Sequence, residues 1–234
     1  IRDTSVTGVQ TCALPILIGR RDTFERGVPV MVGGGTIDLV TLDEVSWAAP
    51  PERDEAGSPN TVGAVALAAA IRQLQAVGMN TVARHEAELT SYALEQLKAV
   101  PGIRLFGSTD PQRTMERVGV IPFLMEQADH FKVAAVLGHE YGIGVRSGCF
   151  CAHPYLLHLM QIDDAAARRV RARMAAGDRS RMPGLIRASF GLYNTRQDVD
   201  ALVEALYAVA KGAYRGRYPQ DKASGEYVPE GWQP

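Results

Sequence analysis

Thirteen residues in the second half of the chain, Gly142 to Pro154, constrain its fold and chemistry more than any other stretch. They hold two of the three cysteines of the chain, together with an arginine, a histidine and three glycines. The apolar run from Ile143 to Val145 predicts a short strand that enters a glycine-hinged loop, and Pro154 prevents a simple continuation of that strand. Loops held by a scaffold often carry functional residues, so this loop is the first candidate site.

The residues of the loop leave its chemistry open. Positive charge on Arg146 and His153 would favour the thiolate, the nucleophilic form of a neighbouring cysteine. A buried, unreactive thiol is an equal alternative for Cys149. A disulfide is not expected in a chain this poor in cysteine. A closed zinc site needs four ligands, and Cys12 is the only other cysteine, so we expect no metal.

Two further blocks decide between these alternatives. The loop at 142–154 resembles the active-cysteine loop of class V aminotransferases, especially the cysteine desulfurase and selenocysteine lyase branch. The blocks Glu-Ala-Gly-Ser-Pro-Asn at 55–60 and Ile-Arg-Ala-Ser-Phe-Gly-Leu-Tyr-Asn-Thr at 186–195 follow in the order of the family. With three glycines at 33–35, the resemblance covers most of residues 17–212. It implies a fold type I enzyme that uses pyridoxal 5'-phosphate, with α/β and α+β parts.

The resemblance assigns roles to residues of the loop and the last strand. Cys151 aligns with the reactive cysteine of the family and would take sulfur from substrate cysteine, leaving alanine and a persulfide. Arg187 would grip the substrate α-carboxylate, because a planar guanidinium binds a carboxylate with two donors. The structural alternative for Arg187 is an internal ion pair with Glu140. Arg146 is a second substrate-site candidate that would keep the thiol ionised.

The block at 55–60 precedes a predicted helix. Asn60 is the predicted N-cap, and the alanine-rich run Thr61 to Val77 is apolar almost all round, which predicts a buried helix that ends at Gly78. Gly57 and Ser58 offer a backbone N–H and a hydroxyl near the helix start, an arrangement suited to a phosphate. The resemblance implies that this pair binds the cofactor phosphate of a partner subunit; without it, the pair is simply part of a helix cap.

Two departures from the family leave the reaction open. Cys149 and Phe150 replace the paired histidines of one desulfurase group. The alternative enzyme is a class V aminotransferase, lyase or epimerase that acts on another amino acid, with Cys151 only lining the pocket. The alternative from another class is a non-catalytic homologue that acts as a binding or assembly module.

The sequence predicts four segments. Residues 1–16 resemble the translation of a sequencing-library adapter and are expected to be non-native. Residues 17–78 are the predicted end of a large cofactor domain, 79–212 a small C-terminal domain, and 213–234 an extended tail. The stretch at 17–20 resembles the strand that follows the cofactor-bearing lysine, so we expect that lysine to lie upstream and this fragment not to catalyse alone.

The predicted small domain mixes helices and strands. Asn80 is expected to cap its first helix, and Thr195 with Asp198 to cap its last. The intervening elements are expected at 103–106, 118–124, 131–139, 163–174 and 185–190. Their order predicts helices packed over a mostly antiparallel sheet.

Composition limits the partners. The net charge is −1 and 46% of the residues are hydrophobic, as in a soluble globular protein. A near-neutral charge argues against a nucleic-acid partner. No apolar run is long enough to span a membrane and no stretch resembles a secretory signal, so we expect a cytoplasmic protein. The family resemblance implies a homodimer, a small amino-acid substrate and a sulfur-acceptor protein.

Overall fold

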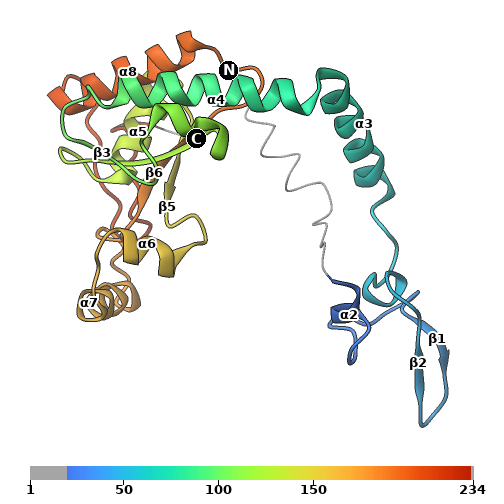
Figure 1. Cartoon of the computed structure of the whole chain (residues 1–234). Helices are drawn as coiled ribbons and strands as arrows, with labels where there is room; N and C mark the ends of the chain where they lie inside the picture. Colours follow the sequence, from blue (N-terminus) through green and yellow to red (C-terminus); the bar gives the residue numbers. More distant parts are fainter. Residues whose placement is uncertain (1–19, 233–234) are drawn as a thin grey trace. The chain divides into compact units, whose positions relative to one another are not determined.

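The computed structural model describes residues 20–232 (Figure 1). The described residues divide into two compact units, 20–77 and 78–232, and each unit is described by itself. The predicted adapter-like segment and residues 17–19 lie outside the described residues. None of the helices in 20–232 is by itself long and apolar enough to cross a membrane; α3 and α4 reach that length and hydropathy only together, as a bent pair.

The unit at 20–77 is small and open. It contains two strands that pair antiparallel as a hairpin, two short helical turns and one long helix. In chain order these are α2 (Arg21–Phe24), β1 (Ile37–Val40), β2 (Val45–Trp47), η1 (Glu52–Asp54) and α3 (Thr61–Val77). The predicted cap of α3 is confirmed, because the Asn60 side-chain oxygen accepts from the Gly63 N–H at 2.9 Å. The helix ends at Val77, and Gly78 follows with φ +88°.

The predicted burial of α3 is wrong for these residues. Gly63 is the only buried residue of the helix, and several of its large apolar side chains are exposed, among them Val62 at 82% and Val65 at 62%. The helix forms because alanine-rich sequence favours helical backbone. Burial is a separate matter, since it requires other elements to pack on the helix.

The unit at 78–232 is built on one antiparallel sheet in the order β3-β4-β6-β5. The prediction of helices over a mostly antiparallel sheet is confirmed. The elements before the cysteine loop are α4 (Met79–Leu97), β3 (Ile103–Leu105), η2 (Pro111–Glu116), β4 (Val120–Met125) and α5 (His130–Tyr141). The loop and the elements after it are β5 (Arg146–Gly148), α6 (His153–Leu159), α7 (Asp164–Ala175), β6 (Leu185–Ser189) and α8 (Arg196–Lys211).

One face of this sheet carries the core. Every second residue of β4 is buried, as expected for a strand with one face packed on a core. Ile121 and Phe123 of β4 and Ile186 of β6 are fully buried in a cluster to which α4, α5 and α8 contribute. In Figure 1, α4 and α8 run together along this unit. The other face is covered at one end by a smaller cluster that consists of Phe106, Cys149, Leu156 and Leu185.

Helix and strand ends test the local predictions. The predicted box at the start of α8 is confirmed, because the Thr195 N–H donates to the Asp198 carboxylate at 2.8 Å. The predicted Asn80 cap is wrong: α4 begins at Met79 and its cap is Gly78. The strand predicted at 143–145 is also displaced, since pairing with β6 begins only at Arg146.

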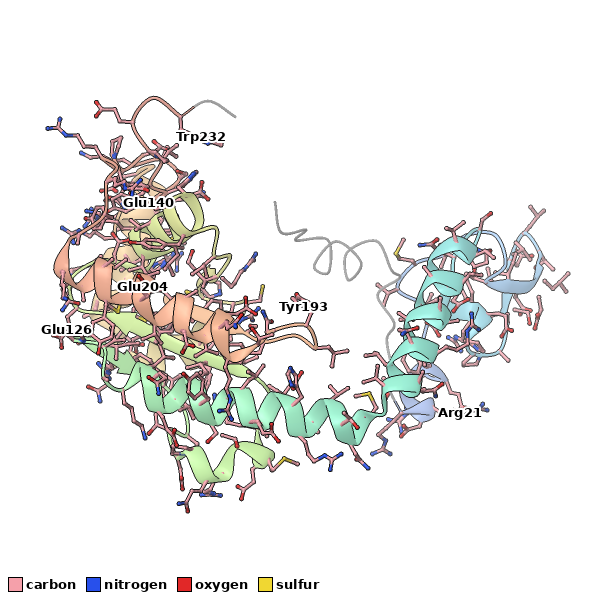
Figure 2. All side chains as sticks on the ribbon, turned by 90° about the horizontal axis from the view of Figure 1, so that it is seen from above. Arg21, Glu126, Glu140, Tyr193, Glu204 and Trp232 are labelled. Carbon is pink, nitrogen blue, oxygen red and sulfur yellow. The ribbon has the colours of Figure 1, made fainter. Side chains whose placement is uncertain are left out.

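The described part of the tail after α8, residues 213–232, packs on the body of this unit without forming a helix. Glu140, near the end of α5, accepts from the Arg215 and Gly216 N–H groups at 2.9 and 2.8 Å and from the Tyr218 hydroxyl at 3.0 Å. Trp232 lies with its ring edge-on to His139 at 5.6 Å between ring centroids. Figure 2 labels Glu140 and Trp232 at the end of this unit where the tail passes α5.

Candidate active site around the cysteine loop

The cysteine loop closes as a tight turn from Cys149 to Ala152. The Ala152 N–H donates to the Cys149 carbonyl at 2.8 Å, and the residues between them have positive φ, 52° at Phe150 and 59° at Cys151. Two consecutive positive φ values are typical of the type I′ turn, which glycine and asparagine normally supply. Holding other residues there costs on the order of 1–3 kcal/mol each, and such strain concentrates at functional sites.

The two cysteines of the turn differ in exposure. Cys149 is 7% exposed, and its Sγ–H donates to the Pro183 carbonyl at 3.1 Å. Burial raises the pKa of the Cys149 thiol, which keeps it protonated and a poor nucleophile. Cys151 is a free, exposed cysteine. The buried-thiol alternative therefore holds for Cys149, and Cys151 is the accessible sulfur of the turn.

The segment before β6 packs against the turn and the end of β5, through Pro183 and Gly184. Next to Pro183, the Met182 carbonyl lies 3.0 Å from the buried His130 Nε2. Burial lowers the pKa of His130, although the bond to Met182 and the charge of Asp129 oppose this shift. A Cβ on Gly184 would come within 2.7 Å of the Gly148 Cα, so only glycine allows the two backbones to approach this closely. His153, predicted to lie beside the thiol, is exposed at the start of α6.

The two candidate arginines face each other across β5 and β6. Arg146 and Arg187 are direct register partners, and directly opposed residues of an antiparallel pair lie on the same face of the sheet. The neighbouring Ile186 belongs to the core cluster, so both arginines are on the face away from that core. Like charges in direct opposition repel each other. Within residues 20–232 neither guanidinium has an ion-pair partner, so this position favours an anion.

The contact of Arg187 is with a ring rather than with a carboxylate. Its guanidinium carbon lies 5.2 Å from the centroid of the Phe150 ring, and its Nε is buried without a hydrogen-bond partner in the part of the chain that the structure describes. The alternative of an ion pair with Glu140 is wrong, because Glu140 accepts from the tail instead. Phe150 was noted in the sequence only as a departure from a histidine, and nothing in the sequence indicated this contact.

The predicted phosphate-binding pair lies in the other unit. Gly57 adopts φ +83°, and its N–H donates to the Gly34 carbonyl at 2.8 Å. The Ser58 hydroxyl is exposed and has no partner within residues 20–232. A phosphate three residues before a long helix suits the positive end of its dipole. Ser58 thus fits a phosphate contact, whereas the Gly57 N–H fits one only if its bond to Gly34 opens.

Among residues 20–232, no three His, Cys, Asp or Glu side chains are placed together in a way that could hold a metal ion.

The chain is similar to known proteins over most of its length. The family described as aminotransferase class-V matches residues 14–202. A probable cysteine desulfurase of Staphylococcus aureus (strain COL) is 35% identical over 191 residues, which is 82% of this chain and 40% of that protein. The apo structure of a cysteine desulfurase from Thermococcus onnurineus NA1 has a TM-score of 0.65 and 31% identity, covering 82% of this chain and 42% of that one. The cysteine desulfurase CsdA from Escherichia coli gives a TM-score of 0.64 at 28% identity, covering 82% and 41%.

The fold is that of part of a fold type I pyridoxal-phosphate enzyme. More narrowly, the chain belongs to the aminotransferase class-V family, whose members use pyridoxal phosphate. The chain spans about 40% of the length of the curated relatives that it matches. The activity of the whole protein is therefore a matter for proposal.

Proposed function

We propose that this chain is part of a cysteine desulfurase in which Cys151 accepts sulfur from L-cysteine. The observation that carries the proposal is the exposed thiol of Cys151, which is the second of the two central residues of a tight turn and has a strained, positive φ. The likeness to cysteine desulfurases over 82% of the chain supports it. The buried Cys149 is a support for the turn rather than a second acceptor.

The proposed step transfers the sulfur atom of L-cysteine to the thiol of Cys151. The Cys151 thiolate attacks the sulfur of the substrate; an S–S bond forms and the Cβ–S bond of the substrate breaks. The bonding pair stays on the substrate carbon, which takes up a proton to give alanine, and Cys151 becomes a persulfide. Pyridoxal phosphate, when bound, would supply an electron sink for this pair.

Residues of this chain would orient the substrate and the cofactor. Arg187 would bind the α-carboxylate through its in-plane donors, and Arg146 would add positive charge on the same face of the sheet. Ser58 would donate its hydroxyl to the cofactor phosphate, with Gly57 shaping the turn beside it. We further propose that the lysine that holds the cofactor lies upstream of residue 17, so that the chain as given is not active alone.

The whole enzyme would act as a cytoplasmic homodimer that passes its persulfide sulfur to an acceptor protein. The resemblance to the family supports this extension. Sedimentation of the longer protein would test the dimer.

The test uses the longer protein that contains the upstream lysine, assayed for sulfide and alanine from L-cysteine. Cys151→Ala should abolish both products from a protein that still binds its cofactor, because no other exposed thiol lies in the turn. Cys149→Ala, the matched control, should retain most activity. Full activity of Cys151→Ala would overturn the assignment. A wild-type protein that transaminates but releases no sulfide would favour an aminotransferase that acts on another amino acid.

A further inference from the structure

A guanidinium held for a substrate has two conflicting needs. A protein group must hold the guanidinium in position, and its N–H donors must remain available to the substrate. A carboxylate partner would satisfy the first need, but it would occupy the donors that the substrate requires. A ring under the flat face of the guanidinium stabilises the cation and leaves its edge free, because the donors lie in the guanidinium plane.

At Arg187 the structure places the guanidinium over a ring and pairs it with no carboxylate among residues 20–232. The guanidinium carbon lies 5.2 Å from the centroid of the Phe150 ring. The Nε is buried and unpaired among the described residues, and no carboxylate of residues 20–232 forms an ion pair with Arg187. Phe150 also packs, partly buried, against the small cluster that contains Cys149 and Leu185.

The backbone at Phe150 indicates that the ring position is enforced. Its φ of +52° is a value that a bulky residue adopts only at a cost. The closing bond from Ala152 to Cys149 and the packing of Cys149 against Pro183 hold the turn in this form. The same turn thus points the ring at Arg187 and displays Cys151 one residue later.

We propose that Phe150 is the positioning residue for Arg187 and thereby sets the affinity of the site for the substrate α-carboxylate. This inference rests on the proposed function, in which Arg187 binds that carboxylate. Phe150 and Cys151 are adjacent residues of the same turn. Through that turn, Phe150 couples the carboxylate site at Arg187 to the sulfur site at Cys151.

The test measures carboxylate binding on the 234-residue chain and does not require activity. The Nε–Hε signal of Arg187 in ¹H–¹⁵N spectra, assigned by its loss in Arg187→Lys, is followed during titration with L-alanine. The same titration with sodium chloride at matched ionic strength corrects for screening. The ring itself is monitored by the ring-current shift of the Arg187 Cδ protons.

Three variants separate the ring from general packing. Phe150→Leu removes the ring but keeps an apolar side chain at the same backbone position. Phe150→Tyr keeps an aromatic ring and should retain the wild-type affinity for L-alanine. Phe106→Leu is the matched control, because Phe106 belongs to the same small cluster and its ring contacts a different guanidinium, that of Arg104, at 4.9 Å.

In the wild-type chain we expect a saturable shift of the Arg187 signal. Phe150→Leu should weaken the affinity for L-alanine by about 2- to 30-fold, the range for loss of one cation–π contact, and should abolish the ring-current shift. Phe150→Tyr and Phe106→Leu should each change the affinity for L-alanine by less than about twofold, below the smallest effect expected for loss of the contact.

Equal affinity in Phe150→Leu and wild type, with the ring-current shift lost, would overturn the positioning role while leaving carboxylate binding by Arg187 intact. An Arg187 signal that never responds to L-alanine in the wild type would overturn this inference together with the carboxylate role of Arg187. The sulfur-accepting role of Cys151 is decided separately, by sulfide release from the longer protein.

Discussion

At the level of single residues, Arg187 has an unusual environment for a charged side chain. It lies in a strand of the main sheet opposite another arginine, with a buried Nε that has no hydrogen-bond partner among residues 20–232. A charge removed from water without a partner destabilises a fold. Arg187 is only half-buried, and an anion bound to its unpaired donors would stabilise the cation beyond its contact with the Phe150 ring.

Replacing Arg187 with Met should therefore leave stability nearly unchanged, within about 1.5 kcal/mol, because an apolar residue of similar length removes an uncompensated charge. In the longer protein the same change should lower kcat/KM by roughly 30- to several-thousand-fold, the equivalent of losing one partner of a charged pair, ~2–5 kcal/mol. Urea unfolding and steady-state kinetics give the two numbers. Arg173→Met, which breaks an exposed pair with Asp178, is the control and should leave kcat/KM unchanged. A large loss of stability with normal turnover would make Arg187 a structural residue.

At the scale of elements, helix α5 is held by the tail at both of its ends. Asp129, its N-cap, accepts from the Lys132 N–H at 2.9 Å and from the Tyr227 hydroxyl at 2.7 Å. Near the other end, burial by itself would raise the pKa of Glu140, but the hydrogen bonds from Arg215, Gly216 and Tyr218 outweigh it and lower that pKa. The tail thus stabilises the ionised form of Glu140.

This shift gives stability a defined pH dependence. Because the pKa of Glu140 is lower in the folded chain, its contribution is present above the pKa of the unfolded carboxyl, about 4.3, and is lost as the pH falls through the folded value. Glu140→Gln should reduce the free energy of unfolding by about 1–3 kcal/mol at pH 7, as expected for hydrogen bonds to a charged group. The difference from wild type should shrink in acid.

Urea denaturation at pH 7 and pH 3 measures this difference. Glu204→Gln is the control, an exposed carboxylate on α8 without an ion pair in the described chain (Figure 2). A Glu140→Gln penalty that is as large at pH 3 as at pH 7 would mean that packing, not charge, holds the tail.

At the scale of the whole molecule, the two units differ in how much they bury. The unit at 78–232 has a continuous core that joins α4, the sheet, α5 and α8. In the unit at 20–77, α3 buries only Gly63 and the hairpin strands carry almost no buried side chains. Amides are protected from hydrogen exchange by the burial and packing of the element that contains them.

Amide hydrogen exchange on the chain should therefore show slow exchange in α4, β4, β6 and α8 and much faster exchange throughout α3. An isolated helix of this length has little stability of its own in water. Equal protection of α3 and α8 would contradict this expectation and would show that α3 is covered in solution. In a longer protein that contains the upstream part of the family fold, we expect α3 to become protected.

Features that depend on neighbouring residues could be predicted from the amino-acid sequence. The Asn60 cap and the Thr195–Asp198 box were predicted correctly, because each is decided within a few positions of the chain. The family was determined in the same way, by three ordered blocks. The limits of the strands were predicted less well than the helix caps. The strand predicted at 143–145 is found at 146–148 as β5, because pairing with β6 fixes where it begins.

Long-range contacts set which thiol is exposed, what Arg187 contacts and what Glu140 binds, and these could not be predicted from the sequence. Cys149 and Cys151 are two residues apart and look alike in sequence, yet only Cys149 is buried, and its thiol bonds to the carbonyl of Pro183, 34 residues away. Glu140 bonds to groups 75 to 78 residues further along, and α3 is apolar without being buried. Burial and pairing depend on which distant segments the fold brings together, and a local pattern carries no record of those segments.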